Sequence, residues 1–381
     1  FFDEGHYDLA RRLVAWLHDH RGLIEADHTG DLERYCRQVL GALGEAGFLD
    51  FVVPNPEDPL SVRIDVRSIC IIREALAFDS GLIDSMFVMQ GLGTSPIWRH
   101  SDPDLRREYL LKARQGELMA ALALTERHGG SDVANVATRA LPVEGGFRID
   151  GEKSWITNGG MADFYVTVAR TGDAPGAGGL SVFLVGRDAK GLEAGPQLDM
   201  VAAHPIANLQ FNDCRVAEHA MIGEPGAGFK LAMAGFDIFR PSVGAAAVGM
   251  ARRALAESVD RVHGRKLFGS PMSDHESVRV KVADMAVETD SAAMMVYRAA
   301  WSADKLGKPV STQSAMAKLM ATEAAQRVID AAVQLFGAEG VWRGSIIENL
   351  YRDVRPTRIY EGASEIQKVV IARGVLGRKS S

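Results

Sequence analysis

The sequence has few cysteines and no long uninterrupted apolar segment. Its 381 residues include only Cys36, Cys70 and Cys214, which are far apart and show no C-x-x-C spacing. We therefore expect no disulfide framework and no zinc site, and we predict that all three cysteines are buried. No apolar run reaches roughly 18 residues, and Asp3 and Arg11 interrupt the region where a signal peptide would need its apolar core. These absences favour a cytoplasmic protein without membrane insertion.

A strong charge of one sign is also absent. The 43 Lys and Arg residues nearly balance 49 Asp and Glu residues, for a net charge of -6, so nucleic-acid binding is not expected. The ten histidines form no metal-binding motif, and the chain contains neither a G-x-S-x-G elbow nor a G-x-x-x-x-G-K-[ST] phosphate loop. None of these common motifs therefore indicates the function.

Hydrophobic periodicity divides the chain into three predicted domains and gives an α+β fold class. Residues 1–117 show helical spacing and predict an N-terminal α-helical domain. Residues 118–228 contain short apolar runs bounded by turn residues and predict a middle antiparallel β domain. Residues 229–381 predict a C-terminal four-helix bundle. The clearest elements are expected as helices at 103–115, 241–263, 274–305, 312–337 and 363–377 and as strands at 119–124, 164–168 and 181–185.

Five segments of the sequence resemble the acyl-CoA dehydrogenase family in their order and spacing. They are ALALTERHGGSD at 121–132, WITNGG at 155–160, RKLFG at 265–269, QLFGAEG at 334–340 and RIYEGASEIQ at 358–367. The resemblance covers nearly the whole chain, although Arg127, Ala338 and Ala363 depart from the usual pattern. It implies the fold described above and FAD as the cofactor.

The implied reaction is the α,β-dehydrogenation of an acyl-CoA thioester to a 2-enoyl-CoA. A carboxylate takes the α proton, the β hydrogen leaves as hydride to N5 of FAD, and the electrons pass to an electron-transfer flavoprotein. By resemblance the carboxylate is Glu361, whereas Phe239 occupies the position of the base in a family variant and cannot accept a proton. The alternative is that Glu361 only favours the start of the next helix, where Ser364 and Gln367 have capping-box spacing.

The resemblance also implies the residues that contact cofactor and substrate. The expected FAD contacts are Leu122, Leu124, Thr125, Gly130, Ser131, Trp155, Thr157, Arg265, Phe268, His275, Gln334, Gly337, Ala363 and Glu365. The expected substrate contacts are Ser131, Asp237, Phe239, Arg240, Gly362 and Arg373. Core packing is the alternative for Trp155 and Phe239. A surface salt bridge is the alternative for Arg240, and a helix-surface position is the alternative for Arg373. No metal site is expected.

Other functions and assemblies are compatible with the same segments. Part of each FAD site is expected to come from a neighbouring subunit, which implies a homodimer or a homotetramer built as a dimer of dimers. An acyl-CoA oxidase that uses oxygen and a noncatalytic flavoprotein of the same fold are the alternatives to a dehydrogenase. Phe239 suggests a restricted pocket for a short-branched, cyclic or aryl-bearing acyl group.

Overall fold

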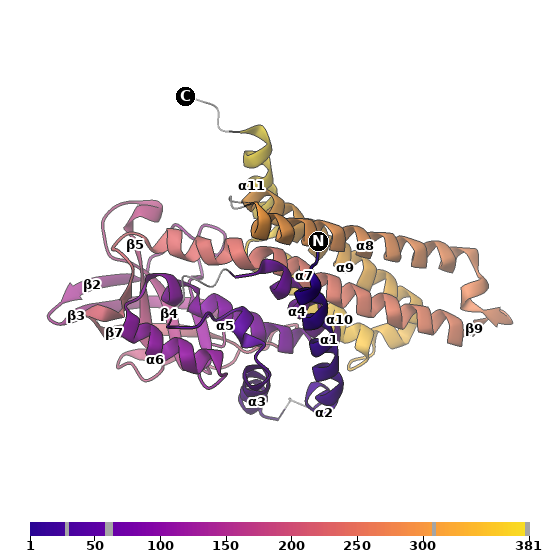
Figure 1. The fold of residues 1–381 in the computed structure, drawn as a ribbon, viewed down its shortest axis with the longest axis horizontal. Helices are drawn as coiled ribbons and strands as arrows, with labels where there is room; N and C mark the ends of the chain where they lie inside the picture. The colour runs from indigo at the N-terminus through magenta and orange to yellow at the C-terminus, as the bar shows by residue number, and fades with distance from the viewer. Residues whose placement is uncertain (27–29, 58–63, 307–309, 378–381) are drawn as a thin grey trace. The chain divides into compact units, whose positions relative to one another are not determined.

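The helices and strands pack into two compact units. A computed structural model describes residues 1–26, 30–57, 64–306 and 310–377 (Figure 1). The first unit combines Phe1–Ile24, Asp65–Asp84 and Asp237–Ser381, and the second combines Glu25–Ile64 and Ser85–Phe236. Helices from both ends of the chain therefore share one core, while the division into three domains in chain order remains a prediction.

The first unit is helical, and its long helices confirm the four predicted in the C-terminal segment. Helix α7 begins earlier than predicted, and α10 was not predicted. The helices are α1 (Glu4–Asp19), α2 (Arg21–Ile24), α4 (Val66–Asp79), α7 (Gly228–Gly264, from Asp237), α8 (Glu276–Lys305), α9 (Ser311–Phe336), α10 (Ile346–Val354) and α11 (Ser364–Leu376). The short strands β9 (Lys266–Leu267) and β10 (Ser270–Pro271) form a hairpin after α7.

Alanine-rich faces form the core of the first unit. One apolar cluster joins Ala246, Ala254, Ala325 and Ala332 from α7 and α9, because small side chains let helix backbones approach closely. Among the described residues, α7 is the one helix long and apolar enough to cross a membrane. Of its most apolar 18-residue window, 67% is buried inside the structure, as expected for a core helix.

Gly249 marks the closest approach between α7 and α4. A Cβ atom at this position would lie 2.1 Å from the carbonyl oxygen of Glu74. We expect Gly249→Ala to lower the free energy of unfolding by about 1–3 kcal/mol, because one of the helix backbones must shift. Chemical denaturation measures the change. Gly264→Ala is the matched control, since a Cβ there would meet no atom within 4 Å, and equal losses in both variants would contradict the packing argument.

The second unit contains the sheet and three helices beside it. The helices are α3 (Leu32–Glu45), α5 (Gly81–His100, from Ser85) and α6 (Pro103–Arg114). The strands are β1 (Ala120–Ala123), β2 (Arg139–Val143), β3 (Gly146–Thr157), β4 (Phe164–Arg170), β5 (Leu180–Gly186), β6 (Leu192–Ala194), β7 (Ile206–Ala217) and β8 (Met221–Ile222). The predicted helix at 103–115 and the three predicted strands are confirmed.

The sheet has the order β6-β7-β3-β2-β4-β5-β8, with β1 beside β4. Most of its pairs are antiparallel as predicted, but β4 runs parallel to both β1 and β2. These parallel pairs are possible because long connections separate the strands in the sequence, which a tight hairpin would not allow. All three cysteines are buried and free, as predicted.

Candidate active site

Glu361 lies in a strained turn between the short 3₁₀ segment Arg355–Arg358 and helix α11. Its φ is 52° and that of Gly362 is 91°, so two successive residues are left-handed. A non-glycine residue in this region costs about 1–3 kcal/mol and persists only where its surroundings enforce it. Here the amide of Gln367 donates to the carbonyls of Glu361 (3.2 Å) and Gly362 (2.8 Å).

The capping box expected at the start of α11 is not formed. Ala363 is the N-cap and receives no side-chain cap bond. The hydroxyl of Ser364 instead donates to Oε1 of Glu323 at 2.6 Å, and Gln367 turns back to the strained carbonyls. A distant carboxylate on α9 thus competes successfully with the local capping interaction.

The side chain of Glu361 is partly buried. Its Oε2 atom is buried and has no hydrogen-bond partner among the described residues. Burial raises the pKa of Glu361 above its usual value, although the nearby cations Arg73, Arg240 and Lys318 act in the opposite direction. An enclosed carboxylate with a raised pKa is suited to accept a proton from a weakly acidic carbon.

The sequence analysis missed a buried ion pair between Arg73 and Asp84. Its cation, Arg73, has a stronger electrostatic effect on Glu361 than Arg240 or Lys318. The guanidinium of Arg73 on α4 donates to both carboxylate oxygens of Asp84 at 2.8 and 2.7 Å. Its third contact is the hydroxyl of Ser242 on α7, at 3.0 Å. Arg73 follows the apolar run Ile69–Ile72, and Asp84 lies among apolar residues of α5. Charged residues beside such apolar runs are the sequence signal that could have identified this pair.

The predicted substrate residues on α7 occupy different environments. Phe239 is fully buried. Its two predicted roles, shaping the acyl pocket and packing in the core, both remain predictions. Arg240 donates to the exposed Asp237 at 2.9 Å, so it forms an ion pair, although only 11% of its own side chain is exposed. Its charge also acts on Glu361. Arg373 lies exposed near the end of α11.

In the second unit, the predicted FAD residues gather where β1 and β3 end. The backbone N–H of Ser154 donates to the carbonyl of Thr125 at 2.9 Å, and the ammonium of Lys153 donates to the carbonyl of Leu124 at 3.1 Å. These bonds bring the loop after β1 beside Trp155. Trp155 is 46% exposed with φ 55°, so it is not a core residue. Leu122 is partly buried in β1, whereas Gly130 and Ser131 are exposed in the following loop.

His204 is a neighbour of Thr157 that the sequence analysis did not identify. Its Nε2 lies 3.1 Å from the hydroxyl of Ser85 and 3.4 Å from that of Thr157. Burial lowers the pKa of His204 to about 4, so the imidazole is neutral near pH 7. A neutral imidazole can accept a hydrogen bond and hold these hydroxyls in place.

The remaining predicted FAD residues belong to the first unit. Phe268, in the β9–β10 hairpin, is 98% exposed with φ 51°. His275 lies over this hairpin, with its Nε2 atom 3.1 Å from the carbonyl of Leu267. Arg261 joins the ends of α7 and α9, since its guanidinium donates to the carbonyl of Phe336 at 3.3 Å. It also contacts Glu339, just beyond α9, at 2.6 Å. The exposed residues Arg265, Gln334, Gly337 and Glu365 complete this set.

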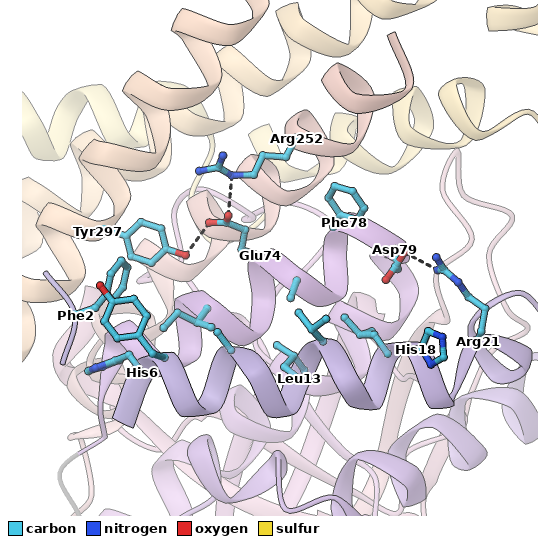
Figure 2. A pocket seen from close by; sticks show the side chains of 16 residues that line it. Phe2, His6, Leu13, His18, Arg21, Glu74, Phe78, Asp79, Arg252 and Tyr297 are labelled. Carbon is cyan, nitrogen blue, oxygen red and sulfur yellow. Dashed lines mark hydrogen bonds and ion pairs between the residues drawn. The ribbon is translucent and has the colours of Figure 1, made fainter. Parts of the chain in front are cut away.

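A cavity of about 620 Å³ lies along α1 and α4, apart from every predicted site residue (Figure 2). Leu13 and Phe78 are among its apolar lining residues. Between the two ends of the cavity, Glu74 accepts from the hydroxyl of Tyr297 at 2.7 Å and from Arg252 at 2.8 Å. The carboxylate of Glu74 is therefore already paired with groups of the protein.

Comparisons with known proteins agree on one family. The model of the acyl-CoA dehydrogenase middle domain matches residues 121–214, and that of the C-terminal domain matches residues 226–376. A probable acyl-CoA dehydrogenase of Mycobacterium leprae is 35% identical over 92% of this chain and 91% of its own. Cyclohexane-1-carbonyl-CoA dehydrogenase of Geobacter metallireducens is 33% identical over 92% and 91%. The structure of butyryl-CoA dehydrogenase from Megasphaera elsdenii superposes with a TM-score of 0.90, at 29% identity over 99% of each chain.

Proposed function

Because the chain belongs to the acyl-CoA dehydrogenase family, we propose that it oxidises an acyl-CoA thioester to the 2-enoyl-CoA with Glu361 as the base, FAD as the cofactor and an electron-transfer flavoprotein as the acceptor. The observation that carries this proposal is the enclosed Oε2 of Glu361, which has no hydrogen-bond partner among the described residues and lies in a strained turn. A purely structural carboxylate at a helix start would bond to the helix N–H groups.

Glu361 acts in this proposal through both its side chain and its backbone. The carboxylate takes the α proton, and its enclosure excludes water that would compete for it. The main-chain N–H of Glu361 is the proposed donor to the thioester oxygen as negative charge develops there. Gly362 follows immediately with φ 91°. A Cβ atom there would lie 2.6 Å from the side-chain amide nitrogen of Gln367, so glycine permits the close packing of this turn.

The residues present fit FAD. Trp155 and Phe268 are large aromatic residues held exposed in left-handed backbone, an arrangement typical of side chains that await a ligand or partner. Thr125, Trp155 and Thr157 would hold the isoalloxazine, and Arg265 would bind the diphosphate through charge-assisted hydrogen bonds. Bound FAD would supply the acceptor for the β hydrogen.

A homo-oligomer accounts for the exposed hairpin. A phenylalanine that is 98% exposed contributes nothing to the core of its own chain. We propose that Phe268 and Arg265 of one subunit and Gln334 and Gly337 of another complete each FAD site, in a dimer or a dimer of dimers. Sedimentation of the holoenzyme distinguishes these two assemblies.

The proposed substrate carries a short-branched, cyclic or aryl-bearing acyl group. Phe239 supports this proposal because it occupies the position of the base in a family variant. An aromatic side chain that lines the acyl pocket from that position would limit the space for a long straight chain. Two of the three relatives compared above are named for a cyclic and for a short straight acyl group. A straight medium-chain thioester as the best substrate would contradict the proposal.

An anaerobic titration tests the proposed function. The purified holoenzyme is mixed with a panel of acyl-CoA thioesters while the visible absorbance of the flavin is followed, and air is then admitted. Bleaching that persists in air and is reversed by an electron-transfer flavoprotein supports the dehydrogenase. Rapid reoxidation in air would identify an oxidase. A protein that takes up no FAD, or a yellow protein that no thioester bleaches, would contradict the proposal.

A further inference from the structure

Helix α9 holds the turn that carries Glu361 at three points. The ammonium of Lys318 donates to the carbonyl of Gly362 at 3.0 Å. Five residues further along α9, the carboxylate of Glu323 accepts from Nε of Arg358 at 2.9 Å and from the hydroxyl of Ser364 at 2.6 Å. The turn is therefore fixed to one helix before, within and after its strained part.

Lys318 is the unusual member of this set because it is completely buried. Burial lowers its pKa to about 8, while the charge of Glu361 acts in the opposite direction. A buried ammonium is costly unless it is hydrogen-bonded and faces an opposite charge. Gly362 supplies the hydrogen bond and Glu361 supplies the charge, so the placement of Lys318 is matched to this turn.

The other cations around Glu361 are already paired with carboxylates. Arg73 on α4 binds Asp84 on α5, and Arg240 on α7 binds Asp237. The hydrogen bond of Lys318 goes instead to a neutral carbonyl. The positive charge of Lys318 also favours the ionised form of Glu361. Lys318 is itself affected by the charges of Glu323 and Arg358.

We propose that Lys318 is a positioning residue for the base: its ammonium fixes the strained turn through the Gly362 carbonyl and favours the ionised form of the Glu361 carboxylate. This inference rests on the proposed role of Glu361. Glu323 fixes the flanks of the same turn without adding positive charge, which allows the two effects of Lys318 to be separated by mutation.

The experiment isolates proton removal from oxidation. Tert-butylacetyl-CoA has hydrogens on its α carbon and none on its β carbon, so the holoenzyme can exchange the α proton for deuterium but cannot oxidise the thioester. The exchange rate in D₂O is measured by mass spectrometry across a pH series. The rate rises with pH as the base ionises, and the midpoint of this acid limb reports the pKa of the base.

Lys318→Met and Lys318→Gln are expected to move the acid limb upward by about one pH unit, because one of the three cations that favour ionised Glu361 is gone. Lys318→Gln can still donate to the Gly362 carbonyl and so guards against a folding defect in Lys318→Met. Glu323→Gln is expected to slow exchange by loosening the turn, without an upward shift. Lys368→Met, an exposed lysine on α11, is the matched control and is expected to behave as wild type.

An unshifted acid limb in both Lys318 variants would overturn the inference, whether the exchange rate is normal or uniformly reduced, because a merely structural lysine would lower the rate at every pH alike. The role of Glu361 itself is tested separately. If Glu361→Gln still exchanges the α proton at the wild-type rate, the base is elsewhere and the proposed function fails in that part.

Discussion

Replacing Glu361 with glutamine is expected to leave FAD bound and to slow flavin reduction by an acyl-CoA by about 10²- to 10⁴-fold, the usual contribution of a positioned general base. Glutamine has nearly the shape of glutamate but cannot accept the α proton. The cation cluster of Arg73, Arg240 and Lys318 would remain without its carboxylate. Stopped-flow absorbance under anaerobic conditions measures the rate constant at saturating substrate.

A control and a graded variant make the Glu361 experiment specific. Glu193→Gln makes the same chemical change at an exposed residue of β6 and is expected to reduce at the wild-type rate. Glu361→Asp keeps a carboxylate but withdraws it by one methylene, and aspartate tolerates the left-handed backbone better than most residues. We expect an intermediate rate. Undiminished bleaching of Glu361→Gln would place the base elsewhere.

Lys153→Met is expected to lower the free energy of unfolding by about 3–5 kcal/mol, because it leaves a buried carboxylate without its cation. Lys153 is fully buried and binds Glu126 at 2.7 Å, and Glu126 is 2% exposed. Glu126 also accepts from the N–H groups of Ala137 (2.7 Å) and Thr138 (3.0 Å). These donors would remain, but none of them carries a compensating charge. Chemical denaturation of the apoprotein measures the loss.

The double variant Lys153→Met/Glu126→Gln separates the lost charge pair from lost packing. Removing both charges leaves no uncompensated ion, so a substantial part of the stability is expected to return. Lys190→Met, at an exposed lysine after β5, is the control and is expected to change stability little. A loss in Lys153→Met no larger than in Lys190→Met would show that the pair does not stabilise the loop after β1.

Local patterns predicted the elements well because their causes lie within the elements. Helix α6 begins as predicted, with Asp102 accepting from the N–H groups of Asp104 and Leu105, both at 2.9 Å. The exposed loop between β4 and β5 likewise follows from its glycines. Such features depend on residues a few positions apart, which a single sequence displays directly.

Features set by distant residues could not be predicted in this way. Ser364 has a capping-box spacing, yet Glu323, which lies 41 residues away, accepts from its hydroxyl. The direction of β1 against β4 depends on the path of the chain between them. The five family segments located the candidate residues, but they did not contain Arg73, Asp84, His204 or Lys318, whose importance comes from burial beside those segments.

The left-handed backbone at Glu361 also limits how this position can vary. With φ at 52°, folding alone favours glycine, asparagine and aspartate there and penalises valine, isoleucine and threonine. Proton abstraction favours a different set, the carboxylates. In a saturation library at position 361, a screen for soluble protein and a screen for turnover would therefore enrich different residues, with aspartate common to both. Random drift at this position would most readily yield folded, inactive descendants rather than new bases.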